Sequence, residues 1–242
     1  MLFTSEQVSC GHPDKICDQI ADAVLTDCLR HDPESRVAIE CLIKDNVIVL
    51  AGELTSEHMP DTNALAHEVL RRIGVPESES YESAAFITRQ SRDIARGVDR
   101  GGAGDQGMMY GYATDETPEL MPLPFMLATR ALLALRDLRS PLLLPDAKAQ
   151  VTYDYEAGRI DTFLISTQHR ADVHTVQVKE IVRGIMVQVA ETYGLNTDFR
   201  ALVNPTGRFV QGGTLADPGV TGWKFIADTY GGMCRHGGGA FS

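Results

Sequence analysis

The sequence predicts an α+β fold made of repeated hairpin-plus-helix domains, with two repeats and the start of a third. Two short turns, Asp45-Asn46 and Ala157-Gly158, each separate a pair of apolar strands, and a helix with an apolar stripe follows each pair. A shift of 112 residues overlays the first unit on the second without gaps, aligning Thr55 with Thr167, Glu68 with Glu180, Arg71 with Arg183 and Ile73 with Ile185. The matching lengths favour a duplicated unit.

The first unit begins with a helix. Pro13 suits a first helical position, and the apolar residues that follow recur every four positions, at Ile16, Ile20, Val24 and Cys28. The segments "RVAIECLI" and "VIVLAGEL" then predict a β-hairpin. A second helix is expected over residues 61–73, where Gly74 ends it.

The second unit contains a hairpin formed by "AQVTYDYE" and "RIDTFLIS" and a helix over residues 175–193. A glycine-rich loop over 97–111 and a helix over 124–138 precede it. The segment "WKFIADTY" predicts the first strand of a third hairpin. We therefore expect domains at 1–100, 101–222 and 223–242, and because a lone strand leaves an unpaired edge, we expect another chain to cover it.

Composition excludes several classes of protein. The net charge of −11 disfavours a nucleic-acid partner. No apolar run approaches the ~20 residues of a membrane span, and the N-terminus does not resemble a signal peptide. Five cysteines without a CxxC pair predict reduced thiols in a cytoplasmic protein.

The segment "GHPDK" combines three groups that can handle a phosphate. His12 can donate to a leaving oxygen, Asp14 can ligate Mg²⁺, and Lys15 can neutralise phosphate. The same residues also suit an ordinary helix start, in which the helix dipole favours the acid. The residue types leave both interpretations open.

The segment "GAGDQG" (102–107) matches a dinucleotide-binding pattern in its letters only. No apolar strand precedes it and no periodic helix follows directly, so the required context is missing. We expect instead a mobile loop that closes over a ligand, with Asp105 as its polar end.

Two acids lie in the first predicted hairpin. Glu40 is on the opposite pleat face from Val37, Ile39 and Cys41, and if that face is sheltered the acid requires a cation. Glu53 could serve a substrate amine. The alternative for both is a solvated strand face.

Further polar groups border the second hairpin. Asp146 and Lys148 come just before its first predicted strand, and Ser166 to His169 end the second strand. Arg208 precedes Phe209, a pair that could stack on a purine or could cover a core aromatic. Four histidines have no metal-ligand spacing and are expected at the surface, namely His31, His58, His67 and His169.

Together these segments resemble the S-adenosylmethionine synthetase (methionine adenosyltransferase) family. The resemblance rests on "FTSEQVSCGHPDK", "GVDRGGAGDQGMMYGYATDET", "LPDAKAQVTY", "STQH", "NPTGRFVQGG", "GVTGWKFIADTYGG" and "RHGGGAFS", in the family's order. It implies three α+β domains about a pseudo-threefold axis, subunits that pair their large flat sheets, and active sites between two subunits.

The implied reaction is attack of the methionine sulfur on C5′ of ATP, after which the expelled triphosphate is hydrolysed to pyrophosphate and phosphate. The resemblance assigns catalysis to His12, Lys148, Asp217 and Lys224. It assigns ATP to these four residues and to Asp146, Ala147, Arg208, Phe209 and Ala240. Methionine would contact Glu53, Gln90, Asp105 and Asp217, while Asp14 would bind Mg²⁺, with a contribution from Asp217, and Glu40 would bind K⁺.

Four departures from the family pattern concern the polyphosphate. Cys10 stands where a Glu is usual, the loop around Gly101 is short, and Trp223 replaces an Arg that would clamp phosphate. The sequence also stops before a "GKD" segment that would bring further cations.

Three interpretations follow from these departures. The chain could be a shortened subunit of a heteromeric enzyme whose second, different subunit supplies the missing cations, as the retained "GHPDK", "DAK" and "GRF" segments favour. It could instead be a non-catalytic regulatory or scaffolding subunit that binds a full-length paralogue, as Trp223 and Cys10 favour. It could also be an accidental truncation, although the short loop and Trp223 lie upstream of the end.

Overall fold

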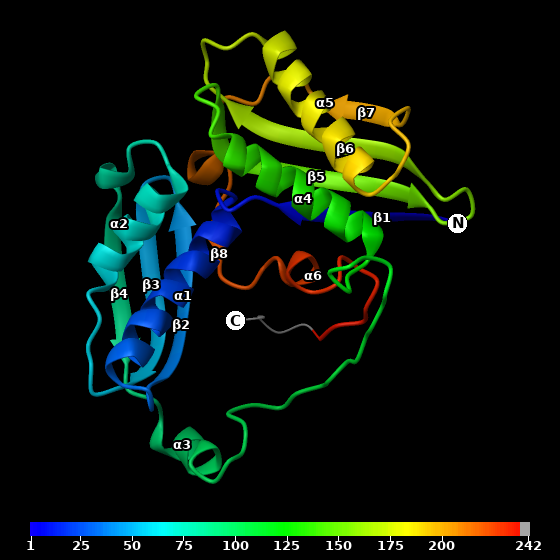
Figure 1. Ribbon diagram of the computed structural model, residues 1–242. Helices are drawn as coiled ribbons and strands as arrows, with labels where there is room; N and C mark the ends of the chain where they lie inside the picture. Colours follow the sequence, from blue (N-terminus) through cyan, green and yellow to red (C-terminus); the bar gives the residue numbers. More distant parts are fainter. Residues whose placement is uncertain (238–242) are drawn as a thin grey trace.

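The chain folds into two lobes, each a four-stranded sheet with two helices on one face (Figure 1). A computed structural model describes residues 1–237. The strand orders are β4-β3-β2-β8 in the first lobe and β1-β5-β6-β7 in the second. Each lobe has its own apolar core between sheet and helices. The predicted α+β class is confirmed.

The first lobe contains the predicted helix, hairpin and second helix. Helix α1 (Pro13–His31) and helix α2 (Thr62–Ile73) pack on strands β2 (Arg36–Lys44) and β3 (Val47–Thr55). Strand β4 (Glu82–Thr88), which the sequence did not indicate, adds parallel to β3. Gly74 ends α2 in the left-handed conformation at φ 84°, as a helix-terminating glycine does.

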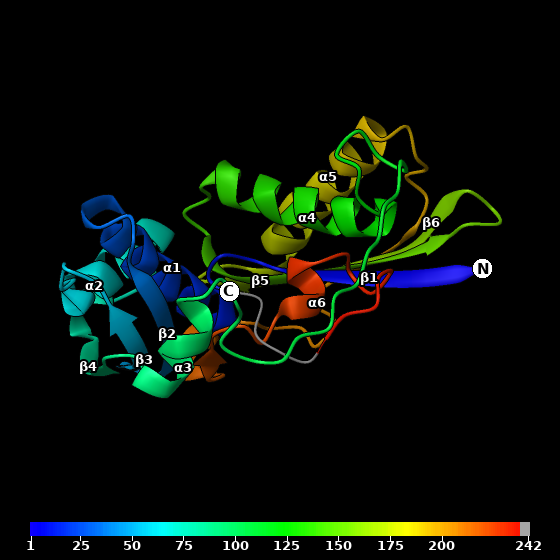
Figure 2. The ribbon, with the colours of Figure 1, turned by 90° about the horizontal axis from the view of Figure 1, so that it is seen from below.

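The second lobe repeats this order. Strands β5 (Leu143–Asp154) and β6 (Arg159–His169) form the hairpin, α5 (Thr175–Thr192) follows, and β7 (Arg200–Val203) adds parallel to β6. Helix α4 (Leu123–Leu138) lies beside α5 on the same side of the sheet (Figure 2). Both units therefore run hairpin, helix, parallel strand, which confirms the repeat.

Two strands cross between the lobes. Strand β1 (Leu2–Val8) pairs antiparallel with β5 in the second lobe, although the chain then enters α1 of the first. Strand β8 (Gly219–Val220) returns from the second lobe and pairs with β2 through Leu42 and Ile43. These exchanges bring both crossing segments to the start of α1 (Figure 1).

The strand predicted for "WKFIADTY" is wrong. Phe225–Asp228 form a short helix, α6, whose Ala227 is buried and whose Ala227 carbonyl accepts from Gln7 Nε2 of β1 at 2.9 Å. Gly222, at φ 77°, turns the chain just before it, so this segment does not extend β8. The argument for a partner from an unpaired strand here therefore falls away.

The remaining elements are short. They are helix α3 (Arg92–Val98) and single 3₁₀ turns at Ser78–Ser80 and Gly213–Leu215. The glycine-rich segment 102–107 follows α3 and leads into irregular chain, so it lacks the strand and helix of a dinucleotide-binding turn.

The approach of β8 to the start of α1 generates a stability prediction. A Cβ on Gly219 would lie 2.2 Å from the carbonyl oxygen of Pro13, which is backbone and cannot move aside. We expect Gly219→Ala to destabilise the fold by ~1–3 kcal/mol, a loss of several degrees in the thermal midpoint for a chain of this size. Gly107→Ala is the matched control, because a Cβ there meets nothing within 4 Å. Equal midpoints for the two variants would contradict the crossing described above.

Candidate active site

A cavity of about 330 Å³ lies at the start of α1, where the lobes meet. Six of the residues predicted to act on ATP line it together, from four separate segments: His12, Asp146, Lys148, Arg208, Phe209 and Asp217. Pro13, Ser166, Asn204, Thr206 and Ala216 complete the lining. The fold thus gathers residues that are up to 205 positions apart around one small space.

His12 caps helix α1 with its ring. The Nδ1 atom accepts a hydrogen bond from the Asp14 backbone N–H at 3.2 Å, and the side chain is only 2% exposed. Burial, and then the nearby Lys224 and Lys148, lower the pKa of His12 from its usual value to about 4. Because the ring is neutral at pH 7 and Nδ1 accepts, its proton is on Nε2, which is a donor.

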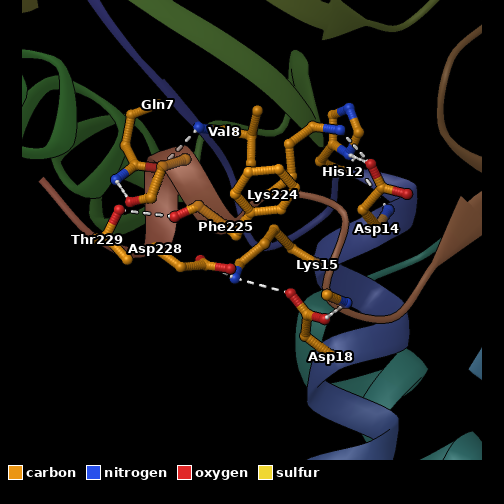
Figure 3. A network of polar contacts seen from close by, with 12 residues as sticks. Gln7, Val8, His12, Asp14, Lys15, Asp18, Lys224, Phe225, Asp228 and Thr229 are labelled. Carbon is orange, nitrogen blue, oxygen red and sulfur yellow. Dashed lines mark hydrogen bonds and ion pairs between the residues drawn. The ribbon is translucent and has the colours of Figure 1, made fainter. Parts of the chain in front are cut away.

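Asp14 holds the returning segment with both carboxylate oxygens. Its Oδ1 accepts from the Val220 backbone N–H at 2.8 Å, and its Oδ2 pairs with the Lys224 ammonium (Figure 3). The Asp14 side chain is 5% exposed and that of Lys224 is 21% exposed. A carboxylate this sheltered requires such partners, since an unpaired buried charge is costly.

A second ion cluster lies one turn further along α1. Lys15 donates to Asp18 at 2.8 Å and to Asp228 of α6 at 2.5 Å (Figure 3). Burial alone would lower the pKa of Lys15, but these two hydrogen bonds outweigh burial and raise it. Asp18 Oδ1 also accepts from the Gly222 N–H. Lys15 is therefore committed to carboxylates and does not line the cavity.

Asp146 and Lys148 enter the cavity from the start of β5. Asp146 is 6% exposed and accepts from the Gly213 N–H at 2.8 Å. Burial raises its pKa above the usual value, although the Gly213 bond and Lys148 oppose this. Lys148 is exposed, so its ammonium is available to a ligand.

Arg208 and Phe209 form the other wall. Phe209 is held at its backbone by His169: its N–H donates to His169 Nε2 at 3.2 Å, and its carbonyl accepts from the His169 N–H at 2.9 Å. His169 is 1% exposed, so the expectation of a surface histidine is wrong. It is buried because β6 extends to residue 169 and the chain 204–210 folds back across its end.

Other predicted residues lie elsewhere. Ala147 faces a separate cavity of about 720 Å³ between α4 and the end of α2, and its N–H donates to Ser9 Oγ at 2.8 Å. Glu40 is exposed in this chain, on the open face of β2 that also carries Leu42. Asp105 is exposed in the loop after α3. Ala240 lies outside the described residues.

Glu53 and Gln90 lie away from the cavity. Glu53 pairs in register with Ala38, whereas β8 joins β2 at Ile43, five residues further along that strand. At ~3.4 Å per residue, Ala38 and Ile43 are about 17 Å apart along β2. The Gln90 Oε1 atom, just after β4, is buried and has no hydrogen-bond partner within the described chain.

The predicted metal ligands supply some, but not all, of the oxygens that a metal ion needs. A carboxylate oxygen is the ligand that Mg²⁺ prefers, and Asp14 offers one, provided that Lys224 moves from Oδ2. Asp217 is exposed on the cavity wall and can contribute another. Glu40 is a single exposed carboxylate, so a K⁺ site there needs oxygens from beyond the described residues.

Sequence reasoning missed Asn204. This buried residue, at φ 42°, accepts from the Thr167 N–H at 2.8 Å and donates to the Thr167 carbonyl at 3.0 Å, so its amide continues the ladder beyond β7. It thereby fixes the chain that carries Arg208. The Asn-Pro-Thr-Gly sequence is a turn signal that could have indicated it.

Comparison with known proteins decides the family. Residues 1–92, 100–209 and 211–242 match the models of the S-adenosylmethionine synthetase N-terminal, central and C-terminal domains. The chain belongs to the S-adenosylmethionine synthetase family. Its relatives include the S-adenosylmethionine synthase of Myxococcus xanthus (strain DK1622), 46% identical, and that of Prochlorococcus marinus (strain MIT 9301), 45% identical.

The chain spans about two thirds of the curated S-adenosylmethionine synthases that it matches. Its whole length aligns, but it covers 65% of the Myxococcus protein and 67% of the Prochlorococcus protein. The 257-residue alignment with the former exceeds the 242 residues of this chain, so that synthase has residues that are missing here. Trp223 is 70% exposed and does not line the cavity.

The lowered pKa of His12 generates a prediction with a definite sign. Between its usual pKa and about 4, the unfolded chain binds a proton on residue 12 that the folded chain does not. His12 therefore contributes a loss of stability as the pH falls through that window. We expect His12→Asn, which keeps a capping oxygen, to lose stability less steeply than wild type between pH 6.5 and pH 4.

Urea unfolding at several pH values measures these slopes, and the ring signals of His12 in an NMR titration give an independent value. The corresponding substitution His67→Asn on α2 is the comparison variant, because it removes a histidine that does not line the cavity. A His12 ring that becomes protonated near pH 6.5 would contradict the prediction.

Proposed function

We propose that this chain is a subunit of a methionine adenosyltransferase, which makes S-adenosylmethionine from ATP and L-methionine with release of phosphate and pyrophosphate. The observation that supports this most strongly is the gathering of His12, Asp146, Lys148, Arg208, Phe209 and Asp217 around one cavity. The activity of the related synthases is consistent with it.

In the proposed reaction the sulfur lone pair forms a bond to C5′, the C5′–O5′ bond breaks, and the electron pair leaves with the triphosphate oxygen. His12 is suited to donate its Nε2 proton in a hydrogen bond to that oxygen, since its ring is neutral and Nδ1 is occupied. Lys148 and Arg208 would attract the phosphates, and Phe209 would stack on the adenine. Bound Mg²⁺ would add charge stabilisation at the polyphosphate.

Lys224 would change partners when the substrate binds. It pairs with Asp14 in this structure, and both groups are assigned to the same polyphosphate and metal. We propose that the phosphates draw the ammonium away, which frees Asp14 Oδ2 for Mg²⁺. The exchange keeps each buried charge paired before and after binding.

We further propose that the site is completed by a second, different synthetase-like subunit. Within residues 1–237 only Lys148 and Arg208 bring uncommitted positive charge to the cavity, against the several negative charges of a triphosphate. The predicted methionine residue Glu53 pairs with Ala38, about 17 Å along β2 from Ile43, where β8 joins, so it would serve a site formed with another chain. The open face of the first sheet exposes Leu42, Val47 and Phe86, an apolar surface suited to pairing.

In the regulatory alternative the chain binds the same partner, but no reaction takes place at this cavity. This alternative is favoured by Trp223, because an exposed indole cannot replace a phosphate-binding guanidinium.

As to compartment, we propose the cytoplasm, where the five free cysteines would remain reduced. None of the helices in the described chain is long and apolar enough to cross a membrane.

The proposed function predicts which mixture is active. We expect little S-adenosylmethionine from the chain alone, and formation in the presence of a second synthetase-like subunit. His12→Ala should lower the activity of that mixture by ~10²–10³-fold through the lost hydrogen bond to the leaving oxygen. Methionine-dependent release of phosphate and pyrophosphate from ATP, with Mg²⁺ and K⁺ present, measures it.

The control is His67→Ala, which replaces a histidine on α2 that does not line the cavity. If the mixture remains active with His12→Ala, the regulatory alternative is correct. Full activity of the lone chain would refute the need for cations from a second subunit.

A further inference from the structure

A cluster of two histidines and one aspartate lies at the end of α1 opposite the cavity. It consists of Asp27 and His31, from the last turns of α1, and His58, from the loop between β3 and α2. One potential ligand atom from each lies within 4.8 Å of the others. In the described part of the chain this is the one such group of three or more His, Cys, Asp or Glu side chains, and the proposed adenosyl transfer does not use it.

The backbone on both sides positions the cluster. Asp27 and His31 are four residues apart on α1, which places both side chains on one helix face. The loop that carries His58 is fixed by its neighbours: Glu57 N–H donates to Asp32 Oδ2 at 2.9 Å, and His58 N–H donates to Ser56 Oγ at 3.0 Å. These hydrogen bonds hold the loop in place and position His58 next to α1.

A hydrogen bond already joins two of the three groups. His58 Nε2 and Asp27 Oδ2 are 2.7 Å apart, and this contact requires a proton on the imidazole. A divalent ion can take the place of that proton, because a metal bound to both atoms at about 2.0–2.2 Å needs them only slightly further apart. In this exchange the ring proton moves to Nδ1, and the carboxylate remains paired with a cation.

His31 completes the set with the orientation typical of a metal ligand. Its Nδ1 lies 2.9 Å from the Asp27 carbonyl oxygen and 3.7 Å from Asp27 Oδ1, and in the tautomer that donates to the carbonyl Nε2 carries a free lone pair. Ligating histidines characteristically donate their other nitrogen to a backbone carbonyl or carboxylate. The His31 and His58 rings are stacked, with centroids 4.0 Å apart, so the two imidazoles lie next to each other.

We propose that Asp27, His31 and His58 bind a zinc-class divalent ion, independently of the adenosyltransferase site. Two imidazoles and one carboxylate are the ligands that Zn²⁺, Co²⁺ and Ni²⁺ accept, whereas Mg²⁺ prefers oxygen alone. Their exposed fractions, 23% for Asp27, 28% for His58 and 55% for His31, leave room for water at further positions. The ion would tie the end of α1 to the β3–α2 loop.

The test is Zn²⁺ titration of the full chain, freed of any affinity tag and of metal, by calorimetry and by thermal unfolding. We expect Zn²⁺, and not Mg²⁺ at the same concentration, to raise the unfolding midpoint. His58→Gln should lose this effect and weaken Zn²⁺ binding at least about tenfold. Co²⁺ bound to the wild type should give visible absorption bands that His58→Gln lacks.

The matched control is His67→Gln. His67 makes the same backbone contact four residues back, from Nδ1 to the Asn63 carbonyl at 2.9 Å, but its Nε2 faces the Tyr81 carbonyl instead of a carboxylate. Zinc held by cysteines would be common to all variants. If His58→Gln is poorly folded by circular dichroism, Asp27→Asn and His31→Gln provide the same comparison. Equal Zn²⁺ binding by wild type and the cluster variants, or an equal loss in His67→Gln, would refute the site.

Discussion

Two carboxylates at the start of α1 hold the structure together where the lobes meet. Asp14 accepts from Val220 N–H and Asp18 from Gly222 N–H, so a single helix end fixes the backbone of the returning segment. Hydrogen bonds to charged groups contribute ~1.5–3 kcal/mol each. They supplement β8, a two-residue strand at the edge of the first sheet, and the hydrogen bonds between Thr221 and Cys41 of β2.

The same contacts determine what the cavity can do. Because Asp14 and Asp18 fix the segment 219–222, they also fix Lys224 and α6, and Lys15 joins the helix to Asp228. At the start of α1 the charges therefore already satisfy one another. Under the proposed function, substrate meets the uncommitted Lys148 and Arg208 but competes with Asp14 for Lys224, and metal binding at Asp14 must be linked to the release of Lys224.

Local patterns predicted the regular elements, and non-local contacts account for what they missed. Helix α1, both hairpins and α5 follow from apolar periodicity and turn residues that are close in the sequence. The exchange of β1 and β8 pairs residues 140 or more positions apart, and no local pattern encodes such pairing. The strand predicted near Trp223 failed for the same reason, since α6 is held by a hydrogen bond from Gln7 of β1 to the Ala227 carbonyl, 220 positions apart.

The site residues show the same difference between local patterns and non-local contacts. His12 and Asp14 could be predicted because the motif that contains them is also a helix start, so local structure and chemistry coincide. The burial of His169 depends on the fold of residues 204–210, forty positions later. The cluster at His31 and His58 has no sequence spacing, because the loop that brings His58 to α1 comes from the far side of a hairpin.

The register of the first hairpin finally constrains how a complete site can form. Strand β8 joins β2 at Ile43, close to the cavity. The predicted methionine residue Glu53, on β3, pairs with Ala38 of β2, which is five positions from Ile43. Strands are stiff over this length, so no loop movement can bring Glu53 to His12. If both residues act on the substrates as proposed, each cavity requires a methionine half from another chain, and the open sheet face around Leu42 and Phe86 is the surface on which that chain can pack.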